Sequence, residues 1–261
     1  MFRYFLIIII TIPLLPLLYI QGKLIQRKLK RLPEAEGNTG TSGDRFKRNL
    51  SILILGESTM AGVGIKQHQN GFPGTLAQEL SEKLTINIHW KVYAKRGFTA
   101  KQITKEILPE IVETHFDLII IGLGGNDTFA LRSPKKWRMH INNLLVALRR
   151  KFGNSPIAFL NMPPIKDFPA FSFPLKITLG NLIELLGKTL NDLVSSKSKV
   201  YFNQEVIEIK KWKEKFTQAD LFSDGVHPSE ISYQLWAKDF SAFLLSNNEI
   251  FSALRKQIWF R

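Results

Sequence analysis

Hydrophobic residues along the chain fall into two alternating patterns. Short aliphatic runs alternate with longer segments that carry an apolar residue at about every third or fourth position. The first pattern indicates buried strands, and the second is typical of amphipathic helices. The predicted strands are residues 50–55, 86–93, 117–121, 157–160 and 200–202. The predicted helices are residues 72–84, 99–112 (with a bend at Pro109), 134–152, 174–194 and 229–245.

Strands that alternate with helices in this way form a parallel sheet covered by helices on both faces. We therefore predict an α/β protein, a three-layer α/β/α sandwich with a five-stranded parallel sheet. The crossovers in such a sheet are right-handed, and ligands bind at the carboxyl ends of the strands. The loops that follow the predicted strands are therefore the first places to look for functional residues.

The first fifth of the chain has a different pattern. Residues 4–20 are almost entirely apolar, near the shortest length that spans a bilayer, and a basic cluster that includes Lys23, Arg27 and Lys28 follows them. A cleavable signal peptide is the alternative, but no small-x-small cleavage site follows the apolar residues. We predict a transmembrane anchor at residues 1–22, a single-pass membrane protein, with a charge bias that favours a cytoplasmic position for the rest of the chain.

Residues 33–44 show no periodicity and are rich in Gly, Thr, Ser and Asn. This composition is typical of a flexible linker. We therefore predict that residues 23–45 form a basic juxtamembrane segment and a flexible linker. Residues 46–261 are then expected to form one folded domain.

Charge and composition narrow the classes of partner. The chain has 261 residues and a net charge of +14, and residues 1–49 hold nine Lys and Arg against three Asp and Glu. The remaining excess is spread along the domain, unlike the concentrated basic patch of a nucleic-acid-binding protein. We expect no nucleic-acid partner, whereas an anionic membrane surface fits the basic cluster. The chain has no Cys, which excludes disulfides and thiol nucleophiles.

Residues 50–64 place a serine at the end of the first predicted strand. The aliphatic run stops at Gly56, and Glu57 and Ser58 follow it. Glycine permits a tight turn and a close approach of a ligand to the backbone. Ser58 is a candidate nucleophile, and an ordinary turn serine is the alternative. The stretch is not the G-x-S-x-G elbow of another hydrolase fold, because Met60 occupies the position of the last Gly.

Two further loops carry candidate donors for an oxyanion. Gly97 follows the second strand, where its backbone N–H could face the site or where it could serve as a simple turn residue. The Gly-rich loop after the third strand ends in Asn126 and Asp127. Asn126 offers an amide donor, although either residue could instead cap the next helix. Phosphate binding is not favoured, because Asp127 stands where the dinucleotide fingerprint requires Gly.

Asp224 and His227 lie three residues apart on one loop near the C-terminus. A carboxylate beside a histidine fixes the tautomer of the ring and stabilises its protonated form, which makes the histidine an effective base. Gly225 between them permits a tight turn. No further metal ligands are found near this pair, so we expect neither a metal ion nor another cofactor.

Four sequence blocks, in this order, resemble the SGNH or GDSL-like hydrolase family. They are Gly56-Glu57-Ser58, Gly97, Gly124-Gly125-Asn126-Asp127 and Asp224-Gly225-Val226-His227-Pro228. The resemblance covers residues 50–245. It implies a flavodoxin-like fold and a serine esterase or lipase that acts on carboxylic esters, such as lipids, lysophospholipids or acetylated sugars.

The resemblance also implies a role for each matching residue. Ser58 resembles the nucleophile, His227 the base, and Asp224 the carboxylate that orients the base. The backbone N–H groups of Ser58 and Gly97 and the side chain of Asn126 resemble the oxyanion hole. The chain departs from the family at one position, because its first block has Glu57 where the family usually has Asp.

Two other functions remain open at this point. An acyltransferase would use the same residues, and a non-catalytic lipid- or carbohydrate-binding module belongs to a different class. The complete set of Ser58, Asp224 and His227 favours an enzyme over a binding module. Residues 161–176, rich in Pro and Phe, follow the fourth strand. They could roof the site and bind acyl chains, or pack against the domain or a bilayer.

Overall fold

The computed structural model describes residues 13, 16, 18–25, 27 and 32–259 of the chain. Within them, a six-stranded sheet has the order β1-β3-β2-β4-β5-β6. The strands are β1 (Thr39–Ser42), β2 (Asn49–Gly56), β3 (Asn87–Ala94), β4 (Leu118–Gly122), β5 (Ile157–Phe159) and β6 (Val200–Phe202). The last five pair in parallel in the flavodoxin-like order, whereas β1 is antiparallel to β3. The α/β class is confirmed, but the prediction of a purely parallel, five-stranded sheet is wrong.

The register of the sheet brings the ends of three strands level with one another. Gly56 at the end of β2 pairs with Ala94 of β3 on one side and with Gly122 of β4 on the other. A Cβ atom added to Gly56 would lie 2.4 Å from the carbonyl oxygen of Gly122. Only glycine fits this close approach of two backbones. The loops that follow these three strands therefore begin at neighbouring points on one edge of the sheet.

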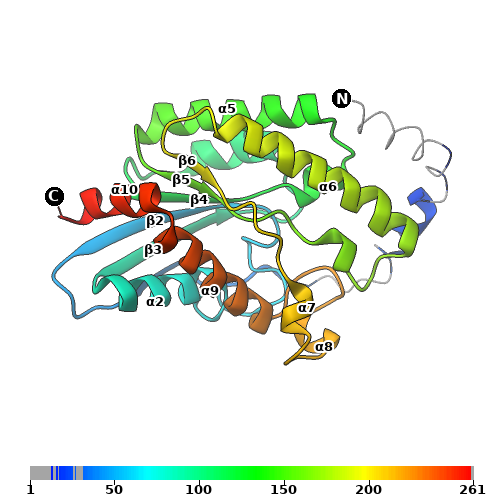
Figure 1. Ribbon diagram of the computed structural model, residues 1–261, viewed down its shortest axis with the longest axis horizontal. Helices are drawn as coiled ribbons and strands as arrows, with labels where there is room; N and C mark the ends of the chain where they lie inside the picture. Colours follow the sequence, from blue (N-terminus) through cyan, green and yellow to red (C-terminus); the bar gives the residue numbers. More distant parts are fainter. Residues whose placement is uncertain (1–12, 14–15, 17, 26, 28–31, 260–261) are drawn as a thin grey trace.

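Helices cover both faces of the sheet and make three layers (Figure 1). One face carries α2 (Phe72–Leu84) and α9 (Glu230–Ser246), and the other carries α5 (Pro134–Phe152) and α6 (Phe173–Val194). Successive side chains of a strand point to opposite faces. Accordingly, Ile52 and Ile54 belong to the core beside α2 and α9, whereas Leu53 and Leu55 belong to the core beside α5 and α6. All four side chains are buried, which explains the unbroken aliphatic run in the sequence.

Local sequence signals account for the ends of α5. Ser133 caps its first turn by accepting a backbone N–H, and Pro134 occupies the first helical position, where no N–H is needed. Gly153 ends the helix with a φ of 62°, a conformation that glycine adopts without strain. Inside the core, the indole N–H of Trp137 donates to the carbonyl of Leu186, 3.0 Å away, and so ties α5 to α6.

The predicted helix at residues 99–112 is instead three short turns. They are α3 (Ala100–Gln102), a π-helical turn, η2 (Ile103–Ile107), and a 3-10 turn, η3 (Leu108–Glu110). Pro109 has no N–H and clashes with the preceding turn, so a continuous helix ends before it. The remaining short elements are η1 (His68–Asn70), α4 (Gly125–Phe129), η4 (Ile165–Asp167), α7 (Ile209–Trp212), α8 (Gln218–Leu221) and α10 (Asn248–Trp259).

The segment predicted as a flexible linker is partly built into the domain. Strand β1 lies within it and pairs with β3 from Thr39 opposite Lys91 to Ser42 opposite Ile88. Just before the strand, the backbone N–H of Ala35 donates to the carbonyl of Ala61 at 2.9 Å. Hydrogen bonds therefore join residues 35–42 to the sheet and to the turn after β2.

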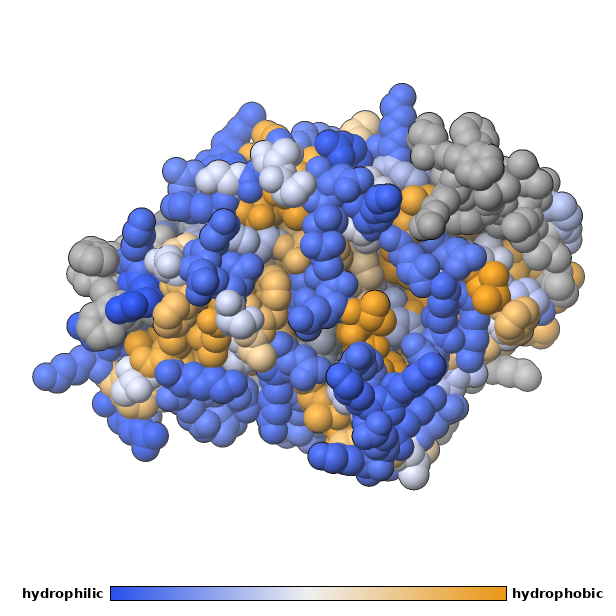
Figure 2. Space-filling model, in the orientation of Figure 1, coloured by the Kyte–Doolittle hydropathy of each residue, from blue (hydrophilic) through white to orange (hydrophobic). Residues whose placement is uncertain are grey.

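Most of the predicted anchor at residues 1–22 lies outside the described residues. No helix in the part of the chain that the structure describes has the length and apolar character needed to cross a membrane. On the face drawn in Figure 2, hydrophilic side chains predominate and hydrophobic ones form small separate patches. Scattered apolar patches of this kind are normal on a folded protein.

Candidate active site

The predicted site residues meet at the carboxyl edge of the sheet. A cavity of about 520 Å³ there is lined by Ser58, Gly97, Asn126 and His227, among other residues. Asp224 is not among the lining residues and lies behind His227, to which it is hydrogen-bonded. All five residues predicted from the sequence are therefore brought together.

Asp224 and His227 form a hydrogen-bonded pair. The ring Nδ1 of His227 lies 2.8 Å from Asp224 Oδ2, and Asp224 Oδ1 accepts the backbone N–H groups of Val226 and His227 at 2.9 and 2.8 Å. Gly225, with a φ of 85°, provides the tight turn that brings the carboxylate onto the backbone. Burial opposes ionisation of Asp224, but the bonds from the ring and backbone of His227 outweigh it and hold the pKa of Asp224 below its ordinary value.

Ser58 lies in the turn directly after β2 and is half-buried. The turn is closed by backbone hydrogen bonds, from the N–H of Ala61 to the carbonyl of Glu57 and from the N–H of Val63 to the carbonyl of Ser58, at 2.9 and 3.1 Å. Within the described part of the chain, the backbone N–H groups of Ser58 and Gly97 donate no hydrogen bond. Two backbone donors beside the cavity are therefore available to a bound molecule.

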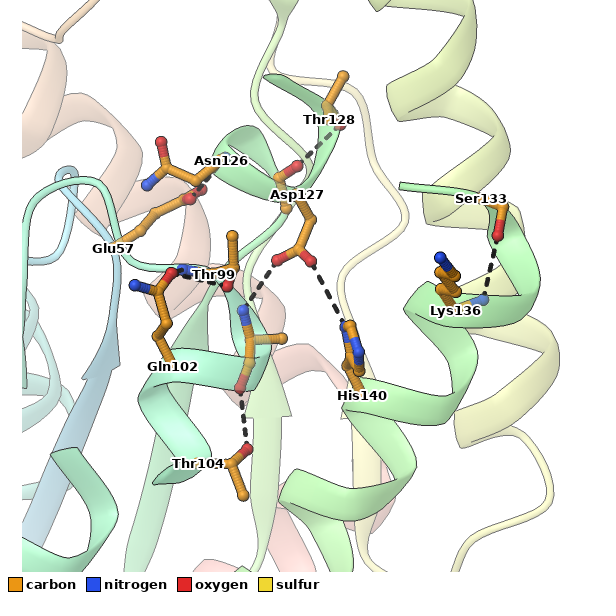
Figure 3. Close-up of polar contacts among 12 residues, drawn as sticks. Glu57, Thr99, Gln102, Thr104, Asn126, Asp127, Thr128, Ser133, Lys136 and His140 are labelled. Carbon is orange, nitrogen blue, oxygen red and sulfur yellow. Dashed lines mark hydrogen bonds and ion pairs between the residues drawn. The ribbon is translucent and has the colours of Figure 1, made fainter. Parts of the chain in front are cut away.

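Glu57 fixes the loop that carries Asn126. Its side chain is buried, and its Oε1 accepts the backbone N–H of Gly125 at 2.7 Å. Its Oε2 accepts the backbone N–H of Asn126, also at 2.7 Å (Figure 3). These amides begin α4 and have no partner within that helix, so the carboxyl group satisfies them. Burial raises the pKa of Glu57 to about 8, against the opposite effect of the two backbone bonds.

The side chain of Asn126 is held towards the Gly97 loop. Its Nδ2 donates one hydrogen to the carbonyl oxygen of Phe98, 3.0 Å away. A side-chain amide has two N–H donors, so the second remains for a ligand in the cavity that Asn126 lines. Neither Phe98 nor the contact of Glu57 could be identified from the sequence, because both depend on how the loops fold together.

Asp127 connects the loop after β4 to the segment that follows the Gly97 loop. Its side chain is fully buried, and Oδ2 accepts the backbone N–H of Ala100 at 2.8 Å, while Oδ1 lies 3.9 Å from His140 Nδ1 (Figure 3). Asp127 therefore accepts the first backbone N–H of α3, the helix that Thr99 caps, and does not cap its own helix. Burial raises the pKa of Asp127 to about 6. No group of His, Asp or Glu side chains among the described residues is arranged to hold a metal ion.

These features define a doubly wound α/β protein whose strand-end loops present a serine, a histidine–aspartate pair and an asparagine to one cavity. The sequence model of the GDSL-like lipase/acylhydrolase family matches residues 54–235. The chain therefore belongs to this family, as its sequence blocks indicated, and it is an ester-hydrolysing enzyme.

Solved structures share the fold. A lipase from a goat rumen metagenome is 21% identical, with a TM-score of 0.54, and the match covers 74% of this chain and 96% of that one. An acetyl xylan esterase from Geobacillus stearothermophilus is 14% identical, with a TM-score of 0.54, over 77% of this chain and 94% of that one. No curated protein matches the sequence significantly.

Proposed function

We propose that the chain hydrolyses carboxylic esters through Ser58, His227 and Asp224. The proposal rests on one observation above all: the His227 ring is bonded to Asp224 at 2.8 Å and lines the same cavity as Ser58 and Asn126. A base oriented by a carboxylate, beside a hydroxyl group at a strand end, is the arrangement that activates a serine.

In the proposed reaction, Ser58 Oγ attacks the ester carbonyl while His227 takes the hydroxyl proton. The tetrahedral intermediate collapses to an acyl-enzyme, and His227 returns the proton to the departing alcohol. Water activated by the same ring then releases the carboxylic acid and restores Ser58. Asp224 holds the ring in the required tautomer and stabilises its positive charge during both steps.

The proposed oxyanion hole consists of the backbone N–H groups of Ser58 and Gly97 and the second N–H of the Asn126 amide. The free state of the two backbone donors supports this assignment. Gly97 has a φ of 80°, and a Cβ atom added to it would meet no atom within 4 Å. The space beside Gly97 is therefore open, and its backbone can approach a bound carbonyl closely.

The substrate class that fits the cavity best is an ester of an aliphatic acid. Lys23 and Arg96 also line the cavity, but most of the remaining lining is apolar and includes Phe129, Leu131, Phe168, Phe171, Leu175 and Leu179. Apolar side chains bind an acyl chain through burial of its surface, whereas an acetylated sugar requires hydrogen-bonding partners for its hydroxyl groups. The Phe-rich loop after β5 supplies Phe168 and Phe171, in agreement with one of its two predicted roles.

The test is to replace Ser58 by Ala. Ser58→Ala is expected to abolish hydrolysis of p-nitrophenyl butyrate and covalent labelling by a fluorophosphonate probe, because both require the nucleophilic hydroxyl group. Ser246→Ala removes an exposed hydroxyl group at the end of α9 and is the matched control. Its activity and its labelling are expected to be unchanged. Normal hydrolysis by the Ser58→Ala variant would refute the proposed function.

A further inference from the structure

Residues 18–25 form a helix, here the N-terminal helix, that lies against the active-site cavity. Leu18, Tyr19, Gly22, Lys23 and Ile25 line the cavity. The spacing of Leu18, Gly22 and Ile25 by four and three residues places these three on one face of the helix. Leu18 is only 8% exposed and belongs to the hydrophobic core, whereas Leu24, which does not line the cavity, is 47% exposed. The helix therefore presents one defined face to the cavity.

Hydrogen bonds tie this part of the chain to the loops of the site. Ser172 Oγ donates to Gln21 Oε1 at 2.7 Å, which joins the helix to the Phe-rich loop before α6. Further along, the Arg96 guanidinium donates to the carbonyl of Leu32 at 2.7 Å, and the backbone N–H of Arg96 donates to Glu34 at 2.8 Å. Since Arg96 is next to Gly97, the chain after the helix is fastened to the proposed oxyanion loop.

Another part of the cavity lining is aromatic and aliphatic. The rings of Phe129 in α4 and Phe171 lie 5.9 Å apart, and Leu175 and Leu179 extend the wall along α6. Leu18 and Ile25 add apolar side chains to a cavity that Ser58 also lines, and Lys23 is the charged residue that this helix contributes. An aliphatic chain bound in this cavity would lie against these apolar side chains.

We propose that the N-terminal helix is the wall of the acyl-binding channel that sets the length of acyl chain the enzyme accepts. This inference rests on the proposed function, because it takes Ser58 as the point from which the acyl chain is measured. It assigns Leu18 and Gly22 as specificity-determining residues. The substrates are then esters whose aliphatic acyl chain is long enough to contact the helix.

Gly22 offers a direct test, because it borders open space. A Cβ atom added to Gly22 would meet no atom within 4 Å, and its φ is not in the left-handed region. Leucine also favours a helix more than glycine does, so Gly22→Leu places a side chain in the channel without disturbing the fold. Gly22→Leu is expected to lower kcat/KM for p-nitrophenyl laurate about tenfold. The reason is that the leucine side chain displaces about two methylene groups of the acyl chain from their contacts in the channel. The ratio of the kcat/KM values for laurate and acetate is the readout, and this ratio is expected to fall.

A pair of leucine variants on the same helix provides the matched control. Leu18→Ala removes a side chain from the channel and is expected to change the ratio of laurate to acetate hydrolysis. Leu24→Ala removes the same side chain from the exposed face and is expected to leave that ratio unchanged. An equal effect of Leu18→Ala and Leu24→Ala would overturn the inference, because it would point to the helix as a whole rather than to its channel face.

Two different measurements test the role of the N-terminal helix and the role of Ser58. If Gly22→Leu hydrolyses both esters in the same ratio as the unaltered enzyme, and Ser58 still reacts with the fluorophosphonate probe, the helix does not measure the acyl chain and the inference falls alone. If Ser58→Ala retains hydrolysis of p-nitrophenyl acetate, the proposed function falls. A selective loss of laurate hydrolysis by Gly22→Leu supports both.

Discussion

Glu57 is the residue at which the chain departs from its family, and the structure gives it a defined place. Its two carboxyl oxygens reach the backbone N–H groups of Gly125 and Asn126, each at 2.7 Å. A Cβ atom added to Gly125 would lie 2.9 Å from Glu57 Oε1, so glycine at that position makes room for the carboxyl group. Glu57 therefore holds the start of α4, and with it the backbone from which the Asn126 side chain projects.

At the same scale, we expect Asn126→Ala to lower kcat about 10²–10³-fold with little change in KM. The reason is that the proposed hydrogen bond from Asn126 to the oxyanion forms only in the transition state, and the variant lacks it. Steady-state hydrolysis of p-nitrophenyl butyrate measures both constants. Asn154→Ala changes the same residue type at an exposed turn and serves as the control. A KM effect without a kcat effect would contradict the assignment and indicate that Asn126 only binds the substrate.

Three of the candidate site residues could be predicted from the sequence because each follows a strand with a clear hydrophobic pattern, whereas Asp224 and His227 lie on the loop between α8 and α9. Ser58, Gly97 and Asn126 come after three such strands, and parallel strands end at the same edge of a sheet. Their supporting contacts could not be predicted. The bond from Asn126 to the carbonyl of Phe98, and that from Ala100 to Asp127, depend on loop conformations that no periodicity encodes.

At the scale of the element, β1 is the clearest difference between expectation and structure. Its residues, Thr39–Ser42, are polar and include Gly, and this composition is as typical of a linker as of a strand. An edge strand needs few apolar side chains, because its stability comes from backbone pairing and from one covered face. Strands β2 and β4 were predictable for the opposite reason, since both of their faces are buried and their residues are almost all aliphatic.

A substitution of Gly40 tests whether β1 packs against Trp90. A Cβ atom added there would lie 2.3 Å from the Trp90 ring, whose side chain is buried. Gly40→Ala is therefore expected to lower the free energy of unfolding by about 1–3 kcal/mol, measured by urea denaturation. Thr39→Ala, at an exposed position of the same strand, is expected to have little effect. Equal stability of the Gly40→Ala and unaltered proteins would mean that the segment is a mobile linker after all.

At the scale of the whole molecule, burial displaces the pKa values of His68, Asp127 and Glu57, among other buried groups. Burial lowers the pKa of His68 from 6.5 to about 4, so the stability from its neutral ring is present above pH 6.5 and is lost as the pH falls towards 4. Burial raises the pKa of Asp127 from 3.8 to about 6 and that of Glu57 from 4.5 to about 8. For both carboxyl groups, stability is present at low pH and is lost as the pH rises through these windows.

The three effects combine into a distinct pH profile. As the pH rises towards about 6, His68 raises the free energy of unfolding whereas the two carboxyl groups lower it, so the changes oppose one another. Between pH 6.5 and 8, Glu57 alone of the three still titrates, so the free energy of unfolding is expected to fall by up to about 1.4 kcal/mol per pH unit. Urea denaturation at a series of pH values measures this slope.

Glu57→Gln provides the control for the pH profile, because the amide does not titrate. The variant is expected to be less stable at neutral pH, since its NH₂ group faces a backbone donor, but its stability is expected to be flat between pH 6.5 and 8. The slope rather than the absolute stability is the relevant quantity. A slope that persists in Glu57→Gln would assign the pH dependence to other groups.

Strand β1 also has a consequence for how the protein behaves in a crowded solution. Without it, β3 would be the edge of the sheet and would offer unpaired N–H and C=O groups beside Ile88 and Trp90, a ready template for strands of other chains. The strand that covers this edge is four residues long and polar, so it gives other chains little to pair with. A segment with the composition of a linker thus shields the sheet against aggregation.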